Sequence, residues 1–136
     1  MDSKGQRWVV PKDASDEEMA RILLPASQLL QQGEAVAFPT ETVYGLGANA
    51  LSDEAVKKIF SAKGRPSDNP LIVHICDEAM ISRVAAKMTH TATLLSQAFW
   101  PGPLTVVVPS TDLVSEFCTA GNFYFYFFQL FWLFIG

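Results

Sequence analysis

The stretch that most constrains the fold runs from residue 35 to residue 75, where two short apolar segments flank an amphipathic one. The apolar segments are Ala35–Phe38 and Leu71–Val73. Between them, Ser52–Ala62 has a capping serine, acids in its first turn and an apolar stripe, which together predict a helix. A strand, a loop, a helix, a loop and a second strand form the crossover unit of an α/β sheet. Ligands usually bind where loops leave the strands of such sheets, so both loops are candidate sites.

The loop before the second strand is rich in groups that bind anions. Lys63 and Arg65 are separated by one glycine, and Asn69 follows in the same loop. Arginine presents a planar fork to phosphate or carboxylate oxygens, and lysine presents a compact point charge. The loop therefore predicts a site for an anionic ligand such as a nucleotide phosphate. The alternative is a solvated basic turn at the end of a helix, where the helix dipole favours a cation.

His74 lies inside the apolar run of the second strand. Alternation along a strand places its side chain on the face opposite Val73 and Ile75. A strand histidine is often structural, but the cationic loop just before this one favours a ligand contact.

The loop after the first strand carries polar groups followed by two glycines. Its hydroxyl and carboxyl groups can bind the polar parts of a small ligand, and the glycines of Gly45-Leu46-Gly47 let backbone N–H groups approach it. The third glycine of a dinucleotide fingerprint is missing, and the sequence has no G-x-x-x-x-G-K-[ST] phosphate loop. A nucleotide would therefore have to bind through a different arrangement of residues. The polar residues of this loop are Thr40, Glu41, Thr42 and Tyr44.

Three motifs, in order along the chain, resemble the YrdC/Sua5 family of threonylcarbamoyl-AMP synthases. They are FPTETVYGLG at 38–47, KGRPSDNPLIVH at 63–74 and WPGPLT at 100–105. The resemblance covers roughly residues 15–121. It implies an α/β fold with an open, twisted, mixed sheet, flanking helices and a concave basic face, of which this chain would hold an incomplete version.

The resemblance also implies a reaction. L-threonine, bicarbonate (or carbon dioxide) and ATP would form threonylcarbamoyl-AMP and pyrophosphate. Downstream threonylcarbamoyl-transferase machinery would use the product to make N6-threonylcarbamoyladenosine (t6A) in tRNAs that read ANN codons. The positions that match the family's site residues are Thr42 and His74 for L-threonine, and Lys63, Arg65, Ser67 and Asn69 for ATP.

Such a reaction needs no nucleophilic side chain. Carbamate attack on the α-phosphate brings anions together, so cations and Mg²⁺ carried with ATP must offset their charge. Catalysis by positioning fits the absence of a Cys/His or Ser/His/Asp arrangement and of a metal-ligand pattern in the sequence. The alternatives are a non-catalytic RNA- or nucleotide-binding remnant, a domain that forms a carbamoyl-adenylate as in hydrogenase maturation, and an inert fragment.

Composition limits the partners. A chain of 136 residues makes at most one domain. Its net charge of −4 argues against a generally basic nucleic-acid binder. Contact with tRNA or double-stranded RNA would need a local patch, although the helix lysines could equally form a solvated face. Cys76 and Cys118 are expected to be reduced thiols of a cytoplasmic protein. The residues of the possible patch are Lys57, Lys58, Lys63 and Arg65.

The rest of the chain is expected to be scaffold. Residues 1–14 form a polar lead-in with no secretory signal, and Arg7–Val10 suits an edge strand. A capping box at Ser15 begins a helix to about Gln32, which Pro25 should kink or split. Trp100 is expected to pack rather than to stack on a base. The remaining predicted elements are helices over Asp77–Lys87 and Thr91–Phe99 and a strand over Leu104–Val108.

The composition changes abruptly after residue 121. Seven of the ten phenylalanines lie within residues 117–136, a span without a charged residue. An aberrant or truncated end of the domain is the favoured interpretation, which divides the chain into 1–14, 15–121 and 122–136. A membrane tail is disfavoured because the apolar run of thirteen residues is shorter than the ~20 needed to span a bilayer. The third interpretation is a genuine core strand and helix.

Overall fold

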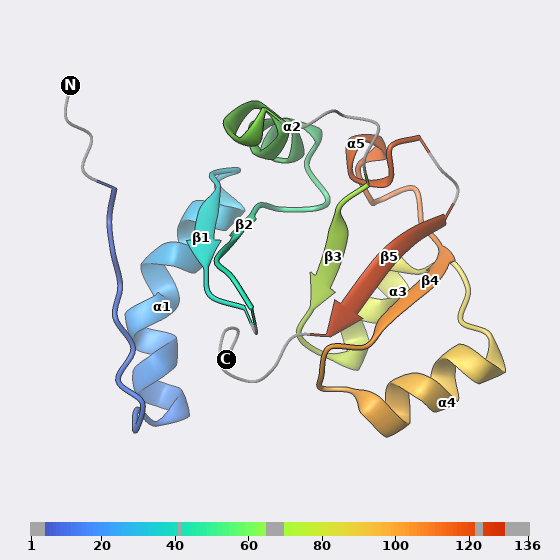
Figure 1. The fold of residues 1–136 in the computed structure, drawn as a ribbon, viewed down its shortest axis with the longest axis horizontal. Coiled ribbons are helices and arrows are strands. Elements are labelled where there is room, and N and C mark those ends of the chain that lie inside the picture. The colour runs from blue at the N-terminus through green and yellow to red at the C-terminus, as the bar shows by residue number, and fades with distance from the viewer. Residues whose placement is uncertain (1–4, 41, 65–69, 122–123, 130–136) are drawn as a thin grey trace.

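The computed structural model describes residues 5–40, 42–64, 70–121 and 124–129, and of residues 124–129 it describes the backbone. The strands form two sheets (Figure 1). One sheet is an antiparallel hairpin, and the other has the order β3-β5-β4, with β3 parallel and β4 antiparallel to β5. The predicted mixed α/β architecture is confirmed. The strands are β1 (Val36–Phe38), β2 (Gly45–Gly47), β3 (Ile72–Ile75), β4 (Thr105–Pro109) and β5 (Tyr124–Gln129).

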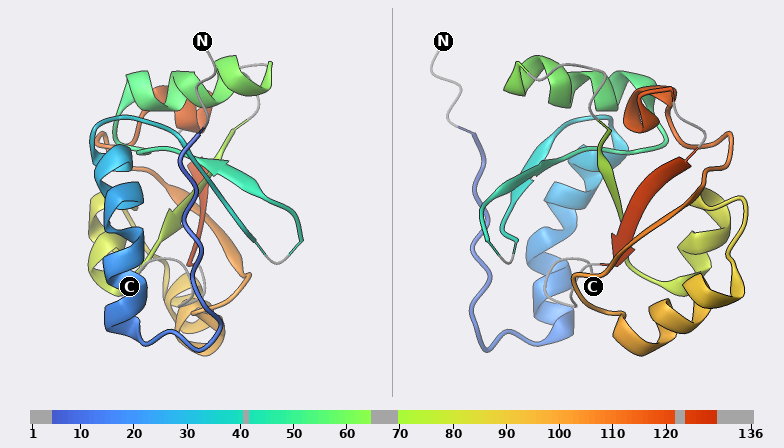
Figure 2. Two further views of the ribbon diagram at one scale, coloured as in Figure 1. Left: turned by 90° about the vertical axis from the view of Figure 1, so that its left-hand side faces the viewer. Right: turned by 45° about the vertical axis from the view of Figure 1, so that its right-hand side comes forward.

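Helices flank both sheets. Helices α2 and α5 lie together where β3 begins, and α1 lies beside the hairpin (Figures 1 and 2). In the part of the chain that the structure describes, no helix is both long and apolar enough to cross a bilayer. The helices are α1 (Asp16–Gln31), α2 (Asp53–Lys63), α3 (Ile81–Val84), α4 (His90–Phe99) and α5 (Glu116–Thr119), with a 3₁₀ turn at Glu78–Met80.

The predicted helix starts are confirmed. The Ser15 hydroxyl accepts a hydrogen bond from the Glu18 N–H at 3.2 Å, and the Ser52 hydroxyl accepts one from the Ala55 N–H at 3.3 Å. Such caps satisfy N–H groups that have no partner inside the helix. Pro25 does not split α1, which runs as one helix from Asp16 to Gln31.

The predicted crossover unit is wrong. The chain reverses after Phe38, so Gly45–Gly47 forms a strand that pairs with β1, with Phe38 opposite Gly45. Strand β3 instead pairs with β5 in the second sheet. An antiparallel partner reached by a short loop loses little chain entropy, whereas a parallel partner needs a long crossover. The backbone hydrogen-bonding groups of the first apolar segment therefore find their partners in a nearby segment of the chain.

Two further predicted elements differ. Arg7–Val10 has no strand pairing. The helix predicted over Asp77–Lys87 ends at Val84, because Ala85 forms an antiparallel bridge with Ser110. The neighbouring Ala86 N–H donates to the Pro109 carbonyl at 2.9 Å. The backbone groups of residues 85 and 86 are thus hydrogen-bonded to the end of β4, and they are not available to extend the helix.

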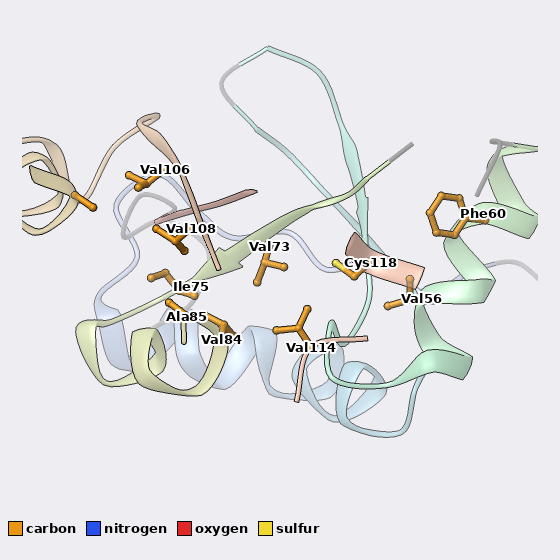
Figure 3. Close-up of a cluster of buried hydrophobic side chains, with 11 residues drawn as sticks. Val56, Phe60, Val73, Ile75, Val84, Ala85, Val106, Val108, Val114 and Cys118 are labelled. Atoms are coloured by element: carbon orange, nitrogen blue, oxygen red, sulfur yellow. The ribbon is translucent and has the colours of Figure 1, made fainter. Parts of the chain in front are cut away.

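The main core lies on one face of the three-stranded sheet (Figure 3). Val73 and Ile75 of β3 point into it, while Ile72 on the other face is 49% exposed. Strand β4 contributes Val106 and Val108 in the same alternating pattern. Trp100 packs against this core and donates its Nε1–H to the Leu104 carbonyl at 2.8 Å, in agreement with its predicted packing role.

The segment predicted as a separate tail supplies backbone to the sheet. Residues 124–129 form β5, which lies between β3 and β4. Without β5, the two other strands would lack their shared partner. The boundary predicted at residue 122 stays a prediction.

Burial of Cys118 predicts a dependence of stability on pH. Burial raises the pKa of the Cys118 thiol from its ordinary value of 9.0 to about 11. The folded state therefore keeps a proton that the unfolded state releases, and stability falls as pH rises from about 9 through 11. Urea unfolding at pH 7.5 and 9.5 checks this. Cys118→Ala should lose less stability over that interval than the unsubstituted chain; equal losses would contradict the prediction.

Candidate functional site

His74 lies on the sheet face that points away from the core. Its neighbours Val73 and Ile75 are 4% and 0% exposed, whereas His74 is half-buried, so the predicted alternation is confirmed. The His74 Nδ1 atom lies 3.0 Å from the Ile72 carbonyl oxygen. A carbonyl oxygen only accepts, so Nδ1 carries the proton in this contact. The second ring nitrogen, Nε2, is an acceptor when the ring is neutral and a donor when the ring is protonated.

An aromatic contact joins His74 to the hairpin. The rings of Phe38 and His74 meet edge to face, with centroids 5.9 Å apart and planes at 76°. This arrangement is favourable for aromatic rings. Phe38 ends β1, so the contact brings the loop that follows β1 to the neighbourhood of β3. Sequence reasoning missed Phe38, although an aromatic residue in a strand that faces a glycine-containing partner is a recognisable signal.

Thr40 organises the loop that carries Thr42. Its Oγ1 accepts from the Val43 N–H at 3.3 Å and from the Thr42 N–H at 3.4 Å, and donates to the Val43 carbonyl. Threonine hydroxyls commonly stabilise turns in this way. Thr42 itself is exposed at the loop, four residues beyond Phe38. Thr40, which its place in the sequence made a possible ligand contact, thus has a role in shaping the loop.

The predicted nucleotide residues are only partly described. Lys63 is the exposed last residue of α2, followed by Gly64 in the left-handed conformation at φ 59°. This glycine ends the helix, since its N–H donates to the Phe60 carbonyl. Arg65, Ser67 and Asn69 lie outside the described residues, as does Glu41.

The two lysines in the middle of α2 have intramolecular partners. Lys58 Nζ lies 3.0 Å from Glu34 Oε1, and Lys57 Nζ lies 4.3 Å from the ring centroid of Phe117. Both contacts are at the surface and contribute little stability. Both contacts limit the freedom of a lysine in the predicted basic patch, and the carboxylate of Glu34 also offsets the charge of Lys58.

A cleft of about 450 Å³ lies elsewhere, between residues 51–54 and 112–116. Its lining includes the carboxyl groups of Asp53, Glu54, Asp112 and Glu116, and none of the predicted site residues. Carboxylates repel phosphate, so this cleft does not suit ATP. Among the described residues, no group of three or more His, Cys, Asp or Glu side chains is placed to hold a metal ion.

Known proteins resemble this chain over most of its length. Residues 28–124 match the model of the Sua5/YciO/YrdC family, described as telomere recombination. A threonylcarbamoyl-AMP synthase of Pyrococcus abyssi is 52% identical over 96 residues, covering 71% of this chain and 28% of the relative. One of Bacillus subtilis is 50% identical over 121 residues, covering 87% of this chain and 34% of the relative.

A solved structure agrees with these sequence matches. The crystal structure of P. abyssi Sua5 complexed with L-threonine superposes with a TM-score of 0.77 at 42% identity. The superposition covers 87% of this chain and 34% of that one. The chain thus spans about a third of the length of these relatives.

Proposed function

Because this chain belongs to the Sua5/YciO/YrdC family, we propose that it takes part in the synthesis of threonylcarbamoyl-AMP from L-threonine, bicarbonate and ATP. The observation that carries the proposal is the placement of His74. Its imidazole lies on the sheet face away from the core and touches the hairpin whose loop bears Thr42. A relative solved with bound L-threonine supports threonine as the amino acid.

The proposed chemistry proceeds by positioning. The amine of L-threonine attacks the carbon of bicarbonate or carbon dioxide to give a carbamate, with loss of water in the bicarbonate case. A carbamate oxygen then attacks the α-phosphorus of ATP, and the bond to the departing pyrophosphate breaks. Thr42 and His74 hold the threonine, and no side chain becomes covalently attached. Orientation of this kind supplies a large part of the rate of a reaction between two bound substrates.

Cations near the nucleotide offset the negative charge that the second step concentrates. Lys63 and Arg65 are proposed to contact the phosphates, with Ser67 and Asn69 as hydrogen-bonding partners. Mg²⁺ would arrive with ATP, since magnesium is commonly held by substrate phosphates and water with few protein ligands. The chemistry that Mg²⁺ supplies is charge neutralisation on the phosphates.

The proposed product passes to a threonylcarbamoyl transferase that makes t6A in tRNA. Such a product is a mixed anhydride with AMP, so a protein that consumes it must transfer the acyl group from AMP. We place this activity in the cytoplasm. Residues 15–121 are proposed to form the partial domain, between a lead-in of residues 1–14 and a C-terminal segment from residue 122, of which residues 124–129 pair with β3 and β4.

Pyrophosphate release tests the proposed function. The purified chain, shown to be folded by circular dichroism, is incubated with ATP, Mg²⁺ and bicarbonate, with and without L-threonine. Threonine-dependent release is the expected result. Carbamoyl phosphate in place of threonine and bicarbonate is the control, because a carbamoyl-adenylate-forming domain would respond to it. A folded chain that neither binds L-threonine nor releases pyrophosphate in its presence would contradict the proposal.

A further inference from the structure

We propose that Phe38 is a positioning residue for His74, and that Gly47 provides the space in which the Phe38 ring sits. This inference rests on the proposed function, in which His74 contacts L-threonine. It adds a residue that acts through His74, with a role distinct from the contacts made by Thr42.

The hairpin holds the Phe38 ring over its glycines. Phe38 pairs directly with Gly45, and Gly47 lies two residues on, so both glycines share the face of Phe38. A Cβ atom built on Gly47 would lie 2.6 Å from Phe38 Cε1, closer than real atoms approach. One built on Gly45 would lie 3.4 Å from Phe38 Cζ, close to an ordinary contact. The ring therefore occupies the space that a side chain at position 47 would need.

Backbone conformation does not explain why glycine occupies positions 45 and 47. Within the described chain, glycines with a positive φ are found at positions 33, 64 and 121, and neither Gly45 nor Gly47 is among them. An alanine could adopt their strand conformation without strain. What distinguishes Gly47 is the proximity of the Phe38 ring, which links the glycine to His74 through one side chain.

The other side of this arrangement restrains His74. The edge-to-face contact with Phe38 limits the tilt of the imidazole, and the contact between Nδ1 and the Ile72 carbonyl fixes which nitrogen carries the proton. Two independent contacts thus restrain the orientation of the ring. A ligand that reaches this imidazole then meets a ring that is already oriented, and binding loses less side-chain entropy.

A pair of alanine variants tests the proposal. Gly47→Ala should displace the Phe38 ring, whereas Gly45→Ala makes the same chemical change where the space nearly suffices. Loss of an aromatic contact such as that between Phe38 and His74 changes an equilibrium constant by roughly 2- to 12-fold. We expect Gly47→Ala to weaken L-threonine binding by that factor, measured by calorimetry, and Gly45→Ala to weaken it less.

Imidazole NMR shifts at constant pH provide a readout that does not depend on threonine. The chain has two histidines, so His90, which is exposed on α4, serves as the internal reference. We expect the His74 signals to move in Gly47→Ala and in Phe38→Leu, and to stay near their original positions in Gly45→Ala and Phe38→Tyr. His90 signals should stay unchanged in all four variants.

The outcomes separate the two proposals. Unchanged His74 signals in both Gly47→Ala and Phe38→Leu would overturn the positioning role, whatever the chain binds. Shifted His74 signals in a chain that shows no threonine binding would overturn the proposed function while keeping the structural link between Phe38 and His74. If Gly47→Ala unfolds, the comparison of Phe38→Leu with Phe38→Tyr decides the matter, because it changes the ring without altering β2.

Discussion

Replacement of Ile75 by alanine is expected to lower the free energy of unfolding by about 2–5 kcal/mol. Ile75 is 0% exposed and lies in the core cluster between β3 and the helices. The substitution removes apolar contacts and leaves a cavity that close-packed neighbours cannot fill. Since small domains are stable by only about 5–15 kcal/mol, this is a large share of the total. Urea unfolding followed by circular dichroism measures the effect.

Ile72→Ala is the matched control for this substitution. Ile72 belongs to the same strand but is 49% exposed on the opposite face, so the same chemical change should cost about 1 kcal/mol or less. Ile75→Val removes one methylene group from the buried site and should cost about 0.5–1.5 kcal/mol. Equal losses in Ile75→Ala and Ile72→Ala would contradict the placement of the core on one face of β3.

Replacement of His74 by alanine is expected to weaken L-threonine binding by about 10- to 100-fold, which is the range for loss of a hydrogen bond to a charged group. The folded state should be nearly unaffected, because His74 is half-buried and contributes an edge contact to the hairpin. Calorimetric titration with L-threonine measures the loss. The prediction follows from the proposed role of His74.

His90→Ala is the control, since it removes the other histidine of the chain from an exposed position on α4. It should leave the threonine affinity unchanged. A His74→Ala variant that binds threonine as tightly as the original chain would show that His74 has a structural role and no role in binding. A variant that also loses most of its unfolding free energy would indicate that the edge contact supports the fold.

Local interactions made several elements predictable. Helix starts at Ser15 and Ser52 depend on a side chain and an N–H group three residues away. The two faces of β3 follow from alternation of side chains along any strand. His74 was therefore placed correctly relative to Val73 and Ile75 from the sequence pattern.

The structure corrected predictions where backbone partners come from elsewhere in the chain. The helix after β3 is short because residues 85 and 86 pair with the end of β4, more than 20 residues later. Strand β1 pairs with a glycine-rich segment that has no strand propensity of its own. Both results depend on which backbone groups meet after folding, and periodicity in one segment carries no information about its partner.

The candidate site shows the same division. By itself, the sequence determined the residue types of the two loops, the alternation that points His74 away from the core, and the serine cap that begins α2, because each depends on neighbours within a few residues. Only the tertiary structure decided that Phe38 touches His74, that Gly47 makes room for its ring, and that residues 124–129 pair between β3 and β4. The contact of Phe38 with His74 and the pairing of β5 join segments far apart in the chain, and the contact of Phe38 with Gly47 depends on the register in which β1 pairs with β2.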